Sequence, residues 1–162
     1  EISECLVGSE MCIRDSCARA EKSQDDARRL MRGWGLAERE GEQVLARLVR
    51  DRFIDDGRYA EAFVRDKLRL SGWGEYKIRT ALQRKRIDRE LIDAALAQAD
   101  RQDMAGRLRQ QLERKMRTTR HTTQYELKTK LIRYGLSLGY DYETVLDSAA
   151  ALVTDTETCD EF

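Results

Sequence analysis

The chain has 162 residues, of which 41% are apolar, 37% charged and only 7% aromatic, and it contains no proline. A chain of this length buries a modest core, so large catalytic folds such as a full barrel are excluded. The composition favours a helical, highly solvated protein. No stretch approaches the roughly 18 apolar residues that a membrane span needs.

Residues that carry catalysis or bind metals are scarce. There is a single histidine, His121, and the four cysteines form no CxxC pair, so the ligands of a structural zinc are missing. We find no activated nucleophile and no glycine-rich phosphate loop. The sequence therefore predicts a protein that is not an enzyme and that has no cofactor and no metal.

The N-terminal sixteen residues are treated separately. Residues 5–16 look like the in-frame translation of a transposon-based sequencing adapter, so we interpret Glu1–Ser16 as a non-native scar ahead of a truncated natural sequence. Beyond it, the two cysteines Cys17 and Cys159 are far apart and follow no secretion signal. They favour a reducing cytosol, and hence a cytoplasmic protein.

Charge is unevenly distributed although the formal net charge is zero. Residues 58–135 contain 20 lysines and arginines against 10 acids, whereas residues 136–162 contain seven acids and no lysine or arginine. A basic middle indicates a polyanionic partner or an acidic protein groove, and the acidic end could compete for the same surface. Solvated helix faces are the alternative explanation.

Three helix starts recur at intervals of about 50 residues. Ser23, Gly74 and Thr123 are accepted N-caps, and each is followed by apolar residues four and eight positions later. Ser23 and Thr123 also have an acid three residues later, as in a capping box. Each helix is expected to stop near Gly33, Arg86 or Gly135 and to be followed by an apolar residue: Leu36, Ile87 or Leu136.

A second helix follows each of these, and a further helix precedes each pair. The preceding helices are predicted at 58–70 and 103–117, and in the first repeat at Cys17–Lys22 only. Asp88 and Asp141 are placed to cap second helices. The apolar stripe of the second helices recurs at i, i+1, i+4 and i+5: Val44, Leu45, Leu48 and Val49; Leu91, Ile92, Ala95 and Leu96; Val145, Leu146, Ala149 and Ala150.

These patterns predict an all-α protein made of three tandem three-helix units, each resembling a helix-turn-helix, in an elongated array whose first repeat is incomplete. The expected divisions are residues 1–16 for the scar, 17–56, 57–100 and 101–153 for the three repeats, and 154–162 for an acidic, frayed tail.

Two motifs that resemble functional sites are interpreted as structural. Asp55 and Asp56 have no histidine or further acid nearby, so we expect them to form the turn before the next helix and to cap it. Trp34 and Trp73, each between two glycines, could stack on bases, but we favour packing at corners between helices. The two tryptophans are not equivalent, because the first follows a capped helix and the second precedes one.

The central motifs resemble the RecX family, bacterial regulators of the RecA recombinase. They are the run FIDDGRYAEAFVR at 53–65, Gly72-Trp73-Gly74, and the basic segment KIRTALQRKRI at 77–87. The resemblance covers about residues 17–152. Arg86 stands where the family commonly has glycine after a lysine, which weakens the expected left-handed helix stop.

The resemblance implies a small monomeric protein that lies in the groove of the RecA filament on single-stranded DNA. It would modulate, most simply inhibit, the ATPase, strand-exchange and co-protease activities of that filament. Contacts to phosphates position a protein without reading sequence, and they weaken as salt rises. Our candidates for these contacts are Arg65, Lys67, Arg69, Lys77, Arg79, Arg84, Lys85 and Arg86.

Two other classes of function are open at this point. A stand-alone helix-turn-helix protein would bind duplex DNA selectively, usually as a two-fold dimer, and the sequence shows no extra apolar stripe to build one. A helical adaptor would bind only a protein partner, would be insensitive to salt, and would tolerate the loss of charge between Lys77 and Arg86.

Overall fold

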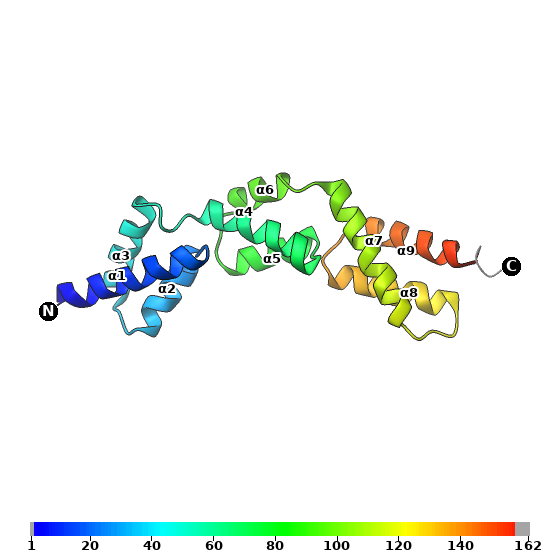
Figure 1. Cartoon of the computed structure of the whole chain (residues 1–162), viewed down its shortest axis with the longest axis horizontal. Coiled ribbons are helices and arrows are strands. Elements are labelled where there is room, and N and C mark those ends of the chain that lie inside the picture. The colour runs from blue at the N-terminus through cyan, green and yellow to red at the C-terminus, as the bar shows by residue number, and fades with distance from the viewer. Residues whose placement is uncertain (1, 158–162) are drawn as a thin grey trace. The chain divides into compact units, whose positions relative to one another are not determined.

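The computed structural model describes the backbone of residues 2–157 and the side chains of residues 7–154. Within this part of the chain it has nine α-helices, one π-helical segment and no strand (Figure 1). The all-α prediction is therefore confirmed. None of the described helices is both long enough and apolar enough to cross a membrane.

The helices follow one another in three groups of three, as the repeat predicts. The first group is α1 (Ile2–Arg19), α2 (Gln24–Gly33) and α3 (Glu38–Arg50); the second is α4 (Asp56–Asp66), continued by the π-helical segment η1 (Lys67–Ser71), then α5 (Glu75–Arg84) and α6 (Arg89–Ala97); the third is α7 (Arg101–Thr118), α8 (Gln124–Ser137) and α9 (Tyr142–Glu157).

The contacts within the fold group the chain into two compact units. Of the described residues, 2–63 pack together with Leu82–Ala95, and we call this part unit 1. Val64–Ala81 pack together with residues 96–157, and we call this part unit 2. The middle group of helices is shared between the units, so each unit is described by itself.

The first helix is longer than we predicted. We expected it over Cys17–Lys22, whereas α1 covers Ile2–Arg19. Ile13 on α1 is fully buried and packs into the core that α2 and α3 form around Val44 and Leu48. The expected bounds were wrong because residues before Cys17 continue the same helix and supply Ile13 to this core.

The predicted helix starts are confirmed by their caps. The Ser23 hydroxyl accepts the Asp26 N–H at 3.1 Å and the Asp26 carboxylate accepts the Ser23 N–H at 3.3 Å, which completes a capping box. Thr123 accepts the Glu126 N–H, but the Glu126 carboxylate bonds to Thr122 instead. Asp55 accepts the N–H of Arg58 at 3.0 Å at the start of α4, as expected for a cap.

The predicted helix ends are right in two repeats and wrong in the third. The chain leaves α2 through Gly35 and α5 through Arg86, which have left-handed φ angles of 80° and 57°. The helix α8, however, continues through Gly135 to Ser137, and the left-handed residue is Gly139. The apolar residue that follows the turn is therefore Tyr140, at 6% exposure.

Leu136, which we expected in that place, is 42% exposed. The reason lies in the packing of α8 against α9. A Cβ atom on Gly135 would stand 2.6 Å from a methyl group of Val145, so Gly135 is a close-contact position inside α8 and not a helix stop. The apolar stripe of the second helices is otherwise buried or partly buried, except that Val49 is 38% exposed.

A backbone junction joins the start of α5 to the turn after α8 within unit 2. The Gly74 N–H donates to the Leu138 carbonyl at 2.7 Å, and the Tyr76 N–H donates to the Gly139 carbonyl at 3.0 Å. These N–H groups belong to the first turn of a helix, where no intrahelical partner exists. A Cβ on Gly74 would lie 2.4 Å from the Gly139 oxygen, so the approach requires glycine.

Replacing Arg86 by glycine should stabilise the protein. A side chain in the left-handed region is strained, and glycine relieves that strain at the cost of a more flexible unfolded chain. We expect Arg86→Gly to raise the free energy of unfolding by about 0.5–1 kcal/mol in urea titrations followed by circular dichroism. A lower stability would mean that the Arg86 side chain makes a stabilising contact.

Candidate binding surface

Lys85 is one of the eight predicted contact residues, and its side chain points into the fold. Its Nζ lies 2.6 Å from the Asp26 carboxylate and 5.6 Å from the centre of the Tyr59 ring, all within unit 1. Partial burial opposes its charge, but hydrogen bonds and the charge of Asp26 raise the pKa of Lys85 above its ordinary value. Lys85 therefore joins α5 to the start of α2 and is not available as a free surface cation.

Asp26 is the acidic half of this pair, and it makes stability depend on pH. Burial opposes its charge, but the hydrogen bond and charge of Lys85, with hydrogen bonds from Ser23, hold the pKa of Asp26 below its usual value. A depressed pKa contributes stability above the unfolded-state pKa, and this is lost as pH falls through the folded-state pKa. The contribution is therefore complete at neutral pH and disappears in acid.

We expect Asp26→Asn to lower the urea midpoint at neutral pH, because the ion pair and half of the capping box are weakened. The difference from the parent should shrink as the pH is lowered from about 7 to about 2, since the parent then protonates Asp26. A difference that stays constant over this range would show that the charge of Asp26 contributes nothing.

Arg84 and Arg86 differ from Lys85 because their side chains are exposed. Within the described part of unit 1 neither makes an ion pair. Arg86 also lines a cavity next to α2 and α3. Arg84 ends α5, whereas Lys85 and Arg86 lie in the turn after it, so the three bases do not share one helix face.

In unit 2 most of the predicted contact residues have contacts within the fold. The ammonium groups of Lys67 and Lys77 each lie 4.7 Å from the centre of the Trp73 ring, and Lys77 also donates to the Ser137 carbonyl. Trp73 is therefore partly buried between η1 and α5, as expected, whereas Trp34, for which we expected the same, is 45% exposed. Arg79 pairs with Glu75 at 3.0 Å.

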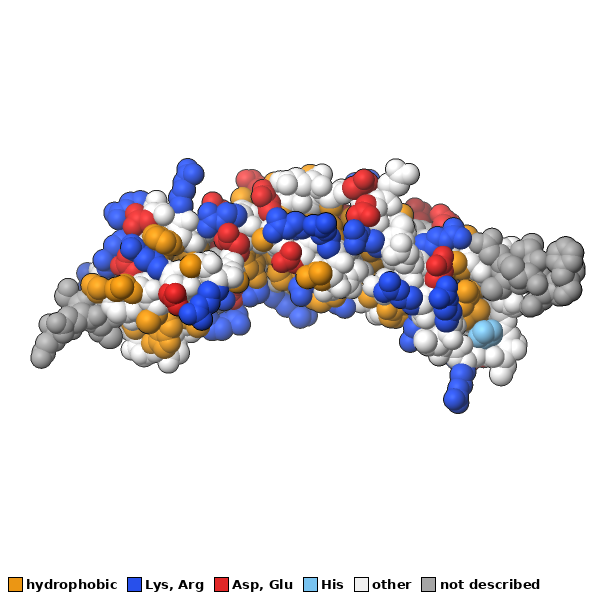
Figure 2. Space-filling model, in the orientation of Figure 1, with side chains coloured by type: hydrophobic (Ala, Val, Ile, Leu, Met, Phe, Trp, Pro, Cys, Tyr) orange, Lys and Arg blue, Asp and Glu red, His pale blue; other side chains and the backbone are white. Residues whose placement is uncertain are grey.

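The most exposed of these predicted residues in unit 2 lie at the end of α4 and in η1. The Arg65 side chain is 61% exposed and lies 3.7 Å from Asp66, and Arg69 is also exposed. Figure 2 shows lysine and arginine side chains interspersed with acids on the visible face, not gathered in one patch.

Further exposed bases in the third repeat were missing from our candidates. They were overlooked because the candidate set was restricted to the central motif, although the charge count of residues 58–135 already included them. They lie on α7, on α8 and in the connection between these helices: Arg101, Arg109, Arg114, Lys115, Arg117, Arg120 and Arg133. Among the described residues no group of three or more histidine, cysteine, aspartate or glutamate side chains could hold a metal ion.

Capped helices in three groups of three, with helix ends that turn through left-handed residues, define a tandem three-helix repeat protein. The family model described as "RecX, second three-helix domain" matches residues 55–96, and that described as "RecX, third three-helix domain" matches residues 102–147. The chain belongs to the RecX family.

Curated relatives agree with this assignment. The "Regulatory protein RecX" of Clostridium botulinum (strain Eklund 17B / Type B) is 33% identical over 97 residues, 59% of this chain and 45% of the relative. That of Serratia proteamaculans (strain 568) is 33% identical over 104 residues, 64% of this chain and 60% of the relative. The chain thus matches less than half the length of the clostridial relative.

Solved structures show the same fold. The "Crystal structure of regulatory protein RecX" superposes with a TM-score of 0.81 at 20% identity, covering 88% of this chain and 70% of that one. RecX from Lactobacillus salivarius superposes with a TM-score of 0.80 at 17% identity, covering 94% and 98%.

Proposed function

We propose that this chain regulates the RecA recombinase by binding the RecA filament on single-stranded DNA and inhibiting its ATPase, strand-exchange and co-protease activities. In this proposal it acts as a monomer, contacts DNA phosphates without reading sequence, works in the cytoplasm, and carries out no catalysis of its own. The observation that carries the proposal is membership of a family whose relatives are named regulatory proteins.

The charge distribution supports the proposal. The basic surplus lies in residues 58–135, which overlap the two matched family domains. A filament of protein and DNA presents many repeated anionic groups, and several weak contacts along it can give high avidity without one strong site. Arg65, Arg69 and Arg84 are the candidates we retain for direct contact, because their side chains are exposed and, unlike Arg86, do not line the cavity next to α2 and α3.

The test is the single-strand-dependent ATPase of a RecA filament, titrated with this chain at two salt concentrations. We expect suppression at ratios well below one chain per RecA subunit, weaker at the higher salt. Arg84→Glu should raise the concentration for half-suppression by about fivefold. The matched control is Arg39→Glu on α3, an exposed arginine outside the basic segment, which should leave suppression unchanged.

Other outcomes would select a different class of function. No effect on the ATPase together with tight binding to duplex DNA would indicate an independent helix-turn-helix protein. No effect on the ATPase and no DNA binding would favour an adaptor for a protein partner. Equal losses in Arg84→Glu and Arg39→Glu would show that overall charge, and not the end of α5, decides the interaction.

A further inference from the structure

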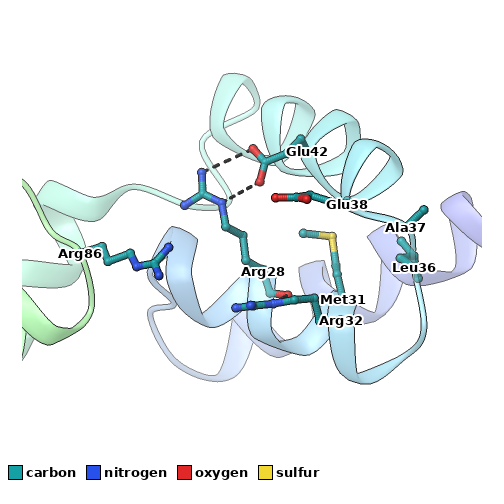
Figure 3. Close-up of a pocket in the computed structure, with 9 residues that line it drawn as sticks. Arg28, Met31, Arg32, Leu36, Ala37, Glu38, Glu42 and Arg86 are labelled. Atoms are coloured by element: carbon teal, nitrogen blue, oxygen red, sulfur yellow. Dashed lines mark hydrogen bonds and ion pairs between the residues drawn. The ribbon is translucent and has the colours of Figure 1, made fainter.

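Unit 1 contains a cavity of about 140 Å³ between α2 and α3 that the proposed function does not use (Figure 3). Its apolar lining comes from Met31, which is 2% exposed and part of the core, and from Leu36, which packs against the same core. Three arginines line it as well: Arg28 and Arg32 from α2, and Arg86 from the end of α5.

The three arginines differ in how their charges are used. Arg28 pairs with Glu42 on α3, with 2.7 Å between Nε and Oε1, so its charge is matched (Figure 3). The Arg32 Nε donates only to the Arg28 carbonyl, at 3.4 Å. Arg32 and Arg86 have no acidic partner within the described residues, so two unmatched guanidinium groups stand beside the apolar wall of this cavity.

The backbone at Arg86 brings its side chain to this place. Its φ of 57° lies in the left-handed region and turns the chain sharply at the end of α5. Arg86 thereby lines a cavity whose other lining residues lie between positions 28 and 42. Glycine would suit this backbone better, but it would remove the cation.

We propose that this cavity binds an acidic peptide segment of a partner protein. One aliphatic or aromatic side chain of that segment would pack against Met31 and Leu36. Its neighbouring carboxylates would bind Arg32 and Arg86. Guanidinium groups bind carboxylates through two parallel hydrogen bonds, which makes arginine the suitable residue for this contact.

The acids in the lining favour a peptide over a nucleic acid. Glu38 and Glu42 line the α3 side of the cavity. A continuous phosphate backbone would place charges next to these two acids, whereas a peptide can place its carboxylates at Arg32 and Arg86 and its uncharged N–H groups at Glu38 and Glu42. An apolar wall beside cations likewise suits a segment in which an apolar residue stands among acids.

The test uses the full chain and a fluorescein-labelled peptide, acetyl-Glu-Asp-Phe-Glu-Asp-amide, followed by fluorescence anisotropy at low salt. Arg86→Gly should weaken binding about tenfold, and urea unfolding of the same variant checks that it stays folded, as expected from the relief of backbone strain. The matched control is Arg52→Gly. Arg52 is also an exposed arginine of unit 1 with a left-handed φ, 59°, and it does not line the cavity.

Arg52→Gly should bind the peptide as the parent does, and a peptide with glycine in place of phenylalanine should bind more weakly. If Arg86→Gly and Arg52→Gly weaken peptide binding equally, the loss follows from the lower net charge of the protein, and the proposal is overturned. Equal binding of both peptides, or no binding by the parent, would also overturn it. If a thymidine oligonucleotide displaces the peptide from the parent but not from Arg86→Gly, the cavity binds nucleic acid, and the proposal of a peptide site is overturned. No RecA is present, so the result is independent of the ATPase test.

Discussion

An alanine at position 139 should lower the free energy of unfolding by about 3 kcal/mol or more. Gly139 has a φ of 92°, where a side chain is strained, and its Cβ would stand 2.4 Å from the Lys77 Cβ and 2.5 Å from the Lys77 backbone nitrogen. The start of α5 would have to move away, which breaks the bonds that Gly74 and Tyr76 donate to the α8–α9 turn.

The measurement is urea unfolding followed by circular dichroism, together with amide hydrogen exchange at the start of α5. The matched control is Gly106→Ala in the exposed middle of α7, where an added Cβ meets nothing within 4 Å. That substitution should raise stability by about 0.5–1 kcal/mol, since glycine is a poor helix former. Parent-like stability and exchange protection in Gly139→Ala would contradict the described junction.

Reversing the charge of Lys85 should lower the free energy of unfolding by about 2–3 kcal/mol. The side chains of Lys85 and Asp26 are only 28% and 21% exposed, so Lys85→Glu would place two carboxylates together with little water to screen them. The contact of the ammonium with the Tyr59 ring would also be lost.

The control is the neighbouring reversal Arg84→Glu, which should change stability by less than about 0.5 kcal/mol because its side chain is exposed. In an Asp26→Asn background, Lys85→Glu should cost clearly less than in the parent, as a double-mutant cycle would measure. Equal costs in both backgrounds would show that the two side chains do not interact.

These two reversals separate structure from binding within one short basic run. Arg84→Glu is expected to leave the fold intact and would therefore report on contacts with a partner. Lys85→Glu disturbs the attachment of α5 to α2, and any loss of activity in it would follow from lost stability. Only Arg84 of this pair is therefore suited to testing the proposed interaction with the filament.

Much of the fold is predictable because it depends on neighbours in sequence. A cap such as Ser23 with Asp26 needs only residues three apart, and an apolar stripe such as Val44, Leu45 and Leu48 needs only the helical period. The left-handed stop at Arg86 was also predictable from its position after a helix, although arginine is a poor residue for it. For the same reason the three repeats and their order followed from pattern alone.

The candidate site was less predictable, because spacing does not reveal where a long side chain finds its partner. The run 84–86 reads as three equivalent bases, yet Lys85 pairs with Asp26, 59 positions earlier in the chain. Arg86 meets a cavity whose lining comes from another repeat. Neither partner leaves a local signal in the sequence.

Local patterns were sufficient for the helical class, the threefold repeat, most helix starts and the family resemblance, since hydrogen bonds and periodicity within a few residues control these. Tertiary packing alone decided that Gly135 lies inside α8, that Gly74 and Gly139 meet, and which bases point outward. Those outcomes depend on how closely segments that are distant in sequence approach one another. Atoms of these segments meet only once the helices have packed, so no local pattern in the sequence reports the contact.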